Sequence, residues 1–125
     1  MAKQILKTSA KSLGPYSTGA WAGDTLFVSG QIAYSAEQER IILDSIPEET
    51  HQIMKNIKGI LEIAGLTWND VVKASIFLTD MGNFSTVNDV YAQYFDIELA
   101  PARECVQVSA LPGGVNVEIS VIATK

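Results

Sequence analysis

Three side chains in the last quarter of the chain have the types that small-molecule chemistry uses: Arg103, Cys105 and Glu118. Arginine presents a planar fork of N–H donors that binds a carboxylate through two hydrogen bonds, so it suits a small anionic substrate. A glutamate near it can orient a water molecule or take a proton from one. A cross-strand ion pair beside a buried thiol accounts for the same pattern, and periodicity alone favours that simpler interpretation.

Four further residues are candidates for the wall of a site: Tyr16, Ser29, Gly30 and Asn88. Tyr16 follows a Gly-Pro turn, and its ring either walls a pocket or packs on the fold. Ser29 and Gly30 end a predicted strand, where a glycine lets a ligand approach the backbone or simply permits a bend. Asn88 lies beside the apolar stripe of a predicted helix, where a buried amide needs a partner from a ligand or a loop.

The composition predicts a single domain over residues 1–125 and excludes several classes of protein. The chain is 47% hydrophobic and 18% charged, which is typical of a globular domain that needs no disulfide or metal. A net charge of −5 argues against a nucleic-acid partner. One cysteine and one histidine, His51, cannot build a zinc site, and they exclude most Cys-His or Ser-His-Asp arrangements unless His51 is the base. We expect a cytoplasmic protein with no membrane segment, because no run approaches 18 apolar residues.

The first two thirds of the chain predict three strands, a helix, a strand and a second helix. Residues 3–8 form a short strand, and residues 20–22 and 25–29 form a hairpin around a Gly-Asp turn. Ser45 begins a long amphipathic helix with a capping box, and Gly65 ends it. Residues 71–78 alternate as a strand with Val72 on its apolar face, and Asn83 caps the second helix.

After Pro101 the pattern changes to period two, which predicts two final strands joined as a hairpin through residues 111–114. Two helices can cover only one face of such a sheet, and we expect the valine-rich face to meet them. Arg103, Cys105 and Glu118 would then lie together on the other face, toward water or another subunit. The hairpin would bring Glu118 within reach of the other two.

Six short segments, taken in order, resemble the Rid family of reactive-intermediate deaminases, also called the YjgF-like or L-PSP family. The resemblance covers essentially the whole chain and is strongest with the subgroup that retains a carboxylate-binding arginine. It rests on residues 14–17 (GPYS), 27–31 (FVSGQ), 56–58 with 64–65 (NIK, AG), 87–91 (VNDVY), 101–106 (PARECV) and 117–119 (VEI).

The resemblance implies an α+β, chorismate-mutase-like fold, with a mixed six-stranded sheet and two helices on one face. It also implies a homotrimer in which the open sheet faces form a barrel and three sites lie between subunits. The implied activity is hydrolysis of 2-iminobutanoate and 2-iminopropanoate to 2-oxo acids and ammonia, with no metal or organic cofactor. A small 2-imino acid would therefore be the partner of the site.

By the same resemblance, Arg103 matches the family's carboxylate-binding arginine, and Glu118 matches the glutamate that positions water. Cys105 and the Gly30 backbone would contact the imine or the water, while Tyr16, Ser29 and Asn88 shape the cavity. The alternatives are a metabolite-binding regulator of the same fold and an endoribonuclease or translation inhibitor. Residues 18–19 (TG) depart from the common Gln-Ala of the family, and this bears on substrate size.

Overall fold

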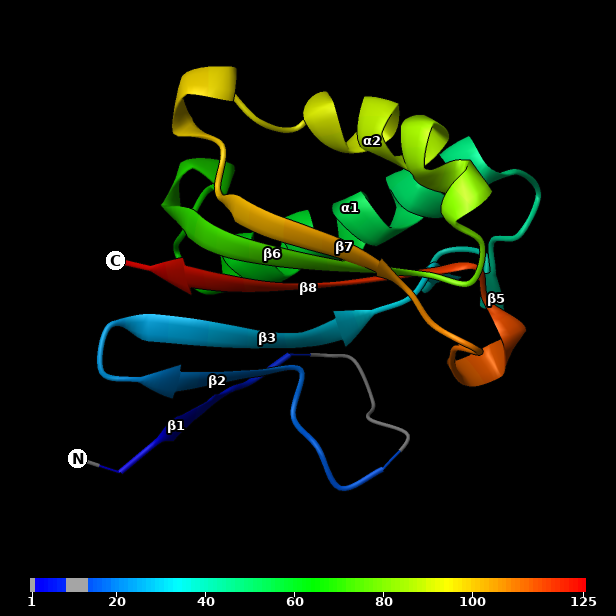
Figure 1. Ribbon diagram of the computed structural model, residues 1–125. Coiled ribbons are helices and arrows are strands. Elements are labelled where there is room, and N and C mark those ends of the chain that lie inside the picture. Colours follow the sequence, from blue (N-terminus) through cyan, green and yellow to red (C-terminus); the bar gives the residue numbers. More distant parts are fainter. Residues whose placement is uncertain (1, 9–13) are drawn as a thin grey trace.

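Two helices lie on one face of a six-stranded mixed sheet, and the described residues place no helix on the other face (Figure 1). The computed structural model describes residues 2–8 and 14–125. The expected α+β class is confirmed. In chain order the main elements are β1 (Gln4–Leu6), β2 (Gly19–Ala22), β3 (Thr25–Gln31), β4 (Tyr34–Ser35), β5 (Arg40–Ile41), α1 (Ile46–Ile63), β6 (Val71–Leu78), α2 (Phe84–Ala92), β7 (Ala102–Gln107) and β8 (Val117–Thr124).

The strands of the large sheet lie in the order β1-β2-β3-β8-β6-β7. Among the described strands, only β6 and β7 are parallel neighbours, and α2 makes the crossover that a parallel pair requires. β8 runs back between β3 and β6, so the predicted hairpin between the last two strands is wrong. The central place of β8 buries one complete apolar face, formed by Val117, Ile119, Val121 and Ala123.

The face of β7 that lies toward the helices is not the one that we expected. Cys105 lies beside Ile76 of β6 and Arg103 beside Ala74, and both of these neighbours are buried under the helices. Val106, expected in the core, is exposed on the open face. Alternation was predicted correctly, but it does not say which face is inward. The aromatic side chains of α2 make the helix side suitable for the arginine stem and its cation.

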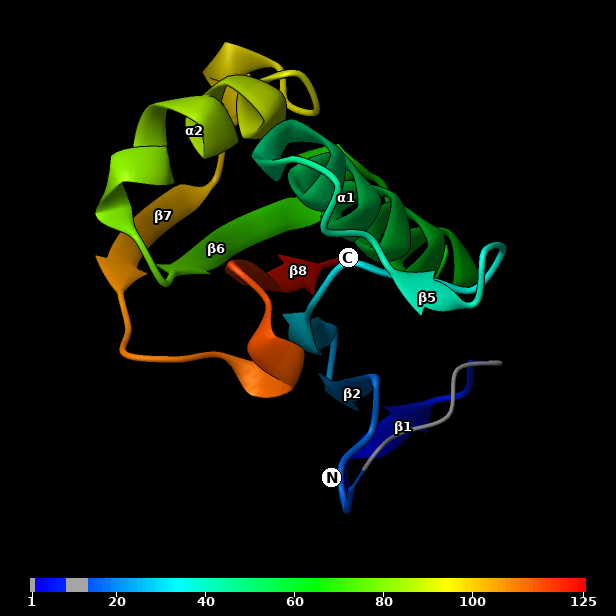
Figure 2. The same cartoon turned by 90° about the vertical axis from the view of Figure 1, so that its right-hand side faces the viewer.

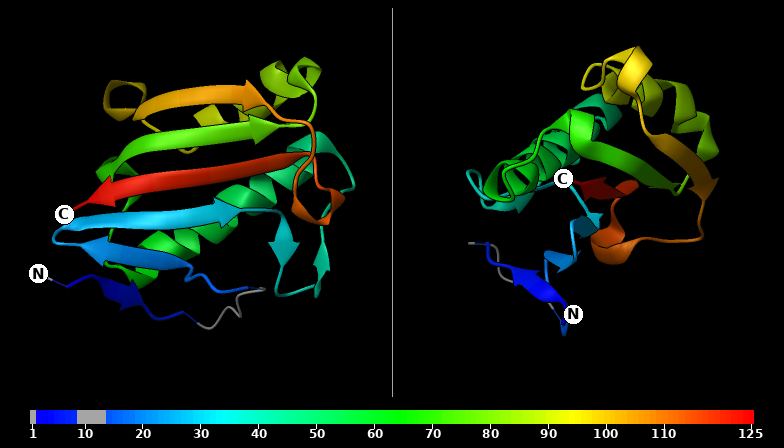
Figure 3. Two further views of the ribbon diagram at one scale, coloured as in Figure 1. Left: turned by 60° about the horizontal axis from the view of Figure 1, so that its bottom comes forward. Right: turned by 90° about the vertical axis from the view of Figure 1, so that its left-hand side faces the viewer.

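Glu118 does lie on the open face, as expected. It is paired with Phe77 of β6, and its neighbours Val117 and Ile119 are buried on the helix side. The left view of Figure 3 looks at this open face with the helices behind the strands, and Figure 2 shows both helices on the same side. Exposed apolar side chains also occur in strands of this sheet, among them Ile5, Phe27 and Val106.

Several local signals in the sequence are confirmed. β2 and β3 form the predicted hairpin around Gly23, whose φ of 59° is a left-handed value that suits glycine. The Ser45 side chain accepts a hydrogen bond of 3.2 Å from the backbone N–H of Glu48 at the start of α1. Gly65, with φ of 75°, follows the end of this helix. Within residues 2–8 and 14–125, neither helix is both long enough and apolar enough to cross a membrane.

Two local expectations are wrong. A bulge between Val71 and Lys73 shifts the register of β6, so Val71 is buried while Val72 is exposed. Asn83 makes no side-chain capping bond at the start of α2. A single 3-10 turn precedes the helix instead, and the carboxylate of Asp80 accepts a bond of 2.8 Å from the N–H of Gly82.

The core lies between α1 and the inner face of the sheet. Ile53, Ile57, Ile60 and Leu61 of α1 are buried at helical spacing, because one stripe of the helix meets the strands. Ile57 has no exposed surface, whereas Ile63 on the outer side is 55% exposed.

Replacement of Ile57 by alanine should lower the free energy of unfolding by about 2–5 kcal/mol, because it leaves a cavity where helix and sheet meet. Chemical denaturation followed by circular dichroism measures this. Ile63→Ala is the control on the same helix and should change the value by less than about 0.5 kcal/mol. Similar losses in the two variants would contradict the packing described for α1.

Candidate active site

The guanidinium of Arg103 is held by one face of α2. Its Nη1 donates a hydrogen bond of 2.7 Å to Oδ1 of Asn88. Its Cζ lies 4.9 Å from the ring centroid of Tyr91 and 5.6 Å from that of Phe84, which are cation–π distances. The three α2 residues are spaced i, i+4 and i+7, so they share one side of the helix. Burial raises the pKa of Tyr91 to about 12, so the ring remains neutral beside the cation.

Arg103 carries a positive charge that no carboxylate among the described residues neutralises. Among the residues that the structure describes, the ion pairs within 4.0 Å join Arg40 to Asp44 and Lys73 to Glu104, and neither involves Arg103. The interpretation of Arg103 as the partner of a cross-strand ion pair is therefore wrong. A half-buried guanidinium bonded only to a neutral amide is suited to bind an anion.

Cys105 lies on the same face of β7 as Arg103, packed partly against the core. Burial raises the pKa of its thiol, and the positive charge of Arg103 opposes that shift in part. The thiolate is the nucleophilic form of cysteine, so a raised pKa disfavours a nucleophilic role for Cys105. We call Asn88, Arg103 and Cys105 the Arg103 cluster.

Glu118 packs against the bare backbone of Gly30. The β3–β8 register shifts between Val28 and Gln31, and the extra residue of this bulge places Gly30 beside Glu118. A Cβ atom on Gly30 would lie 2.6 Å from Oε2 of Glu118, so a glycine is required for this approach. Partial burial raises the pKa of Glu118, which makes the carboxyl a better proton acceptor than an exposed one.

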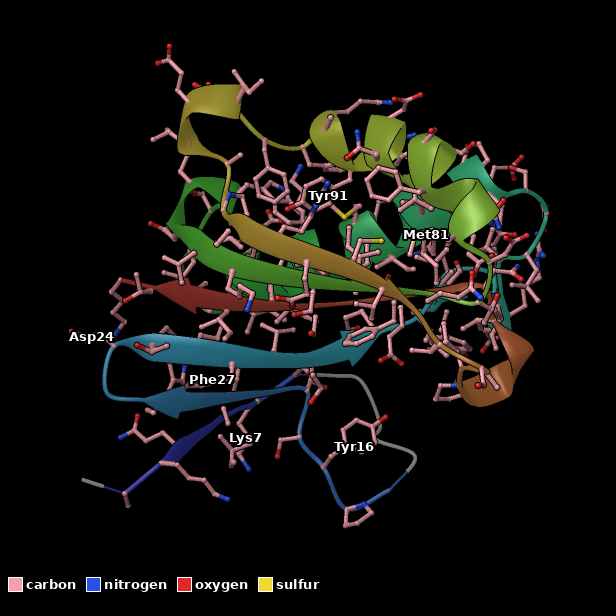
Figure 4. All side chains as sticks on the ribbon, viewed as in Figure 1. Lys7, Tyr16, Asp24, Phe27, Met81 and Tyr91 are labelled. Atoms are coloured by element: carbon pink, nitrogen blue, oxygen red, sulfur yellow. The ribbon has the colours of Figure 1, made fainter. Side chains whose placement is uncertain are left out.

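Ser29 and Tyr16 line a hollow together with Phe27, and the lining of this hollow does not include Gly30 or Glu118. The hydroxyl of Ser29 donates a bond of 2.6 Å to the carbonyl of Ser17, and its backbone N–H donates 2.9 Å to the carbonyl of Thr18. These bonds fix the segment that carries Tyr16, whose ring is exposed near the end of β3 (Figure 4). The hollow has a volume of about 330 Å³. We call Tyr16, Ser29, Gly30 and Glu118 the Glu118 cluster.

The two clusters lie on opposite faces of the sheet. The Arg103 cluster lies on the helix side of the edge strand, whereas Glu118 lies on the open face of a central strand with β6 between them. Two strand spacings separate the backbones of β7 and β8 by about 10 Å. The expectation that one chain would bring Glu118 within reach of Arg103 and Cys105 is therefore wrong.

Two residues that contact Arg103 were not identified from the sequence as site residues. Phe84 and Tyr91 belong to the apolar stripe of the second helix, and their spacing with Asn88 was the signal that all three meet one target. Glu49 of α1 was not singled out either, and its carboxylate is buried and accepts bonds from Asn116 and Val117 at the start of β8. Its signal was an acidic residue four positions before Ile53 on the apolar stripe.

A separate charged group lies on the open face. Glu104 pairs with Lys73 at 3.0 Å and accepts a hydrogen bond from Ser75, and these contacts lower its pKa. Across residues 2–8 and 14–125, no three His, Cys, Asp or Glu side chains gather as a metal site.

Comparison with known proteins gives a consistent similarity over the whole chain. The sequence profile of the family described as Endoribonuclease L-PSP matches residues 6–125. A Bos taurus protein named 2-iminobutanoate/2-iminopropanoate deaminase is 39% identical over 127 residues, covering 100% of this chain and 92% of that protein. Several other relatives are described only as RutC family proteins.

Solved structures agree in fold. A Yersinia pestis protein of the conserved Rid family, of unknown function, superimposes with a TM-score of 0.93 at 41% identity, over 99% of this chain and 100% of that one. The structure of E. coli TdcF with bound serine gives a TM-score of 0.89 at 36% identity, over 98% of each chain.

Gly30→Ala should displace the Glu118 carboxylate, because the new methyl group would occupy its place. The displaced carboxyl gains solvent, so its pKa should fall toward the ordinary glutamate value. Carboxyl-carbon NMR titration measures this. Gly59→Ala on α1 is the control, since a Cβ there meets nothing within 4 Å. An unchanged pKa of Glu118 in Gly30→Ala would contradict the contact.

Proposed function

The chain belongs to the L-PSP family, also called Rid, and on that premise we propose that it is a deaminase that hydrolyses 2-iminobutanoate and 2-iminopropanoate. The observation that carries the proposal is the Arg103 guanidinium, which is held by α2 and has no carboxylate partner among the described residues. The name of the bovine relative supports the reaction, and the serine bound to E. coli TdcF supports a ligand of amino-acid size.

In the proposed complex Arg103 binds the substrate carboxylate. One Nη atom is already committed to Asn88, and the aromatic rings of Phe84 and Tyr91 limit the movement of the guanidinium plane. The remaining N–H groups can meet a carboxylate with two bonds. Such a fixed orientation places C2 of the imino acid at a defined point, and Cys105 lies beside that point on the same strand face.

Glu118 acts on water in the proposed reaction. It takes a proton as the water oxygen bonds to C2, while the electron pair of the C=N bond moves to nitrogen. Glu118 then gives this proton to nitrogen, which forms a carbinolamine. The hydroxyl proton passes through Glu118 to the same nitrogen, the C–N bond breaks as the oxygen forms the C=O bond, and ammonia leaves. An imine is already electrophilic and hydrolyses unaided, so the enzyme needs to lower the barrier by only a few kcal/mol, without metal or organic cofactor.

The proposed site lies between subunits. Since Arg103 and Glu118 lie on opposite faces of one sheet, a single chain cannot apply both to one small substrate. Exposed apolar side chains of the sheet, Phe27 and Val106, favour burial against another copy of the chain. We therefore propose a homotrimer in which the Arg103 cluster of one subunit faces the Glu118 cluster of its neighbour. Tyr16 and Ser29 would form the wall and Gly30 would approach the water.

The alternative functions have less support. A ribonuclease, the activity in the family's description, needs to attract phosphates, whereas this chain has a net charge of −5. Its histidine, His51, lies 2.8 Å from the Tyr94 hydroxyl through Nδ1. A regulator that only binds a metabolite does not require a glutamate with raised pKa near the water position.

Arg103→Lys should lower kcat/KM for 2-iminopropanoate at least about tenfold, because a point charge replaces a two-pronged donor and the substrate is misplaced. The melting temperature should barely move. The assay follows 2-oxo acid or ammonia release from enzymatically generated 2-aminoacrylate, with RNA degradation as a second readout. Cys105→Ser is the comparison and should have a milder effect. Equal and small effects of both substitutions would overturn the role of Arg103.

Glu118→Gln should keep substrate binding and lose most turnover, because the amide cannot accept a proton at neutral pH. The same change should raise the melting temperature near pH 7. The pKa of Glu118 is raised in the fold, so its ionisation destabilises the folded state as pH rises through that pKa, and glutamine removes this effect. Calorimetry and steady-state kinetics measure the two outcomes. Parent turnover in this variant would show that Glu118 is only structural.

A further inference from the structure

Glu49 is a carboxylate with no exposed surface, in the first turns of α1. Its Oε2 accepts hydrogen bonds of 2.8 Å from the N–H of Asn116 and 3.0 Å from the N–H of Val117. Its Oε1 accepts 2.8 Å from the side-chain Nδ2 of Asn116. Within the described residues, the ion pairs do not include it. A buried carboxylate is costly unless its oxygens are bonded, and here three N–H donors supply those bonds.

These three bonds fix the point where the chain enters β8. The two glycines of the preceding turn, Gly113 and Gly114, have left-handed φ values and no side chain to hold the chain, and the buried side chain of Val115 is the hold directly before Asn116. The carbonyl of Asn116 accepts a bond of 3.1 Å from the N–H of Thr79, so residue 116 is held from α1 and from the end of β6. Glu118 is two residues after Asn116 and directly follows Val117, whose N–H is the last one bonded to Glu49.

We propose that Glu49 is a positioning residue for the reaction: it holds the backbone of Asn116 and Val117 so that the Glu118 carboxylate lies at Gly30 and reaches the attacking water. This inference rests on the proposed deaminase function, because it concerns the residue that acts on water there. Within the described residues, the hydrogen bonds of Glu49 go to Asn116 and Val117 and not to Arg103 or its α2 partners, so Glu49 acts on one half of the site only. Rotation or slippage of the first residues of β8 would move the Glu118 carboxylate. It would not disturb Arg103, which binds the substrate carboxylate in the proposed complex.

Glu49→Gln is the direct test, because glutamine keeps the shape but replaces one of the two acceptor oxygens by an N–H₂ group, which then faces an N–H donor of Asn116 or Val117. The expected result is a fall in kcat of about tenfold or more, since small errors of position have such effects, with KM for 2-iminopropanoate nearly unchanged. The pH profile of kcat should also lose the limb that Glu118 sets. A general loss of stability would lower the amount of active enzyme but would not change the pH profile.

The control is Thr50→Val, at the next position of α1. Thr50 is equally buried, and its hydroxyl donates a bond of 2.8 Å to the carbonyl of Ile46. This variant loses a buried hydrogen bond without touching β8, so kcat and its pH profile should match the parent after correction for folded fraction. Asn116→Ala is a milder second variant that removes one of the three bonds, and it decides the question if Glu49→Gln does not fold.

The two possible failures are distinguishable. If the parent and Thr50→Val release no 2-oxo acid from the imine, the proposed function fails. If both hydrolyse the imine while Glu49→Gln or Asn116→Ala keeps the parent kcat and pH profile, the positioning role of Glu49 is overturned. A raised KM with unchanged kcat in either variant would also overturn the positioning role, because that pattern indicates weaker substrate binding at Arg103.

Discussion

Side chains alternate between the two faces of a strand, and helices cover only one face of this sheet. Arg103 on β7 and Glu118 on β8 therefore lie on different sides of one layer, because their β6 neighbours are Ala74 and Phe77. No side-chain rotation can cross a sheet. The proposed chemistry, which needs both groups, thus depends on a second copy of the chain, and the open face with its exposed apolar side chains favours such an assembly.

Each half of the proposed site is prepared by contacts within its own chain. α2 holds the Arg103 cation with an amide and two rings, without a carboxylate among the described residues that would neutralise it. The bulge of β3 holds Glu118 in partial burial, which raises its pKa. Within one chain the two charges cannot pair with each other, so each remains available to the proposed site between subunits.

Much of this arrangement could be predicted from the sequence, and the failures have physical causes. The capped helix after Ser45 and the buried face of β8 follow from local signals that packing reinforces. The placement of β7 could not be predicted, because period two looks the same for either face and for a hairpin or a crossover. The β6 bulge depends on tertiary contacts that no short pattern contains. The same is true of the bonds from Asn116 and Val117 to Glu49, which is 67 and 68 positions away in the sequence. The prediction that one chain brings Glu118 within reach of Arg103 and Cys105 was wrong for the same reason, although the individual candidates came from recognisable motifs.

The most direct test mixes two inactive chains. Arg103→Ala subunits retain Glu118, and Glu118→Gln subunits retain Arg103, so a trimer containing both can form a complete site between them. In random trimers from equal amounts, about a quarter of the interfaces should combine an intact arginine with an intact glutamate, because each requirement is met in half of the cases. The account predicts that imine hydrolysis recovers to about that fraction of the parent rate, in a species of three times the 13.5 kDa chain mass. Mixed trimers that stay as inactive as the separate variants, or a mass of one chain in solution, would contradict it.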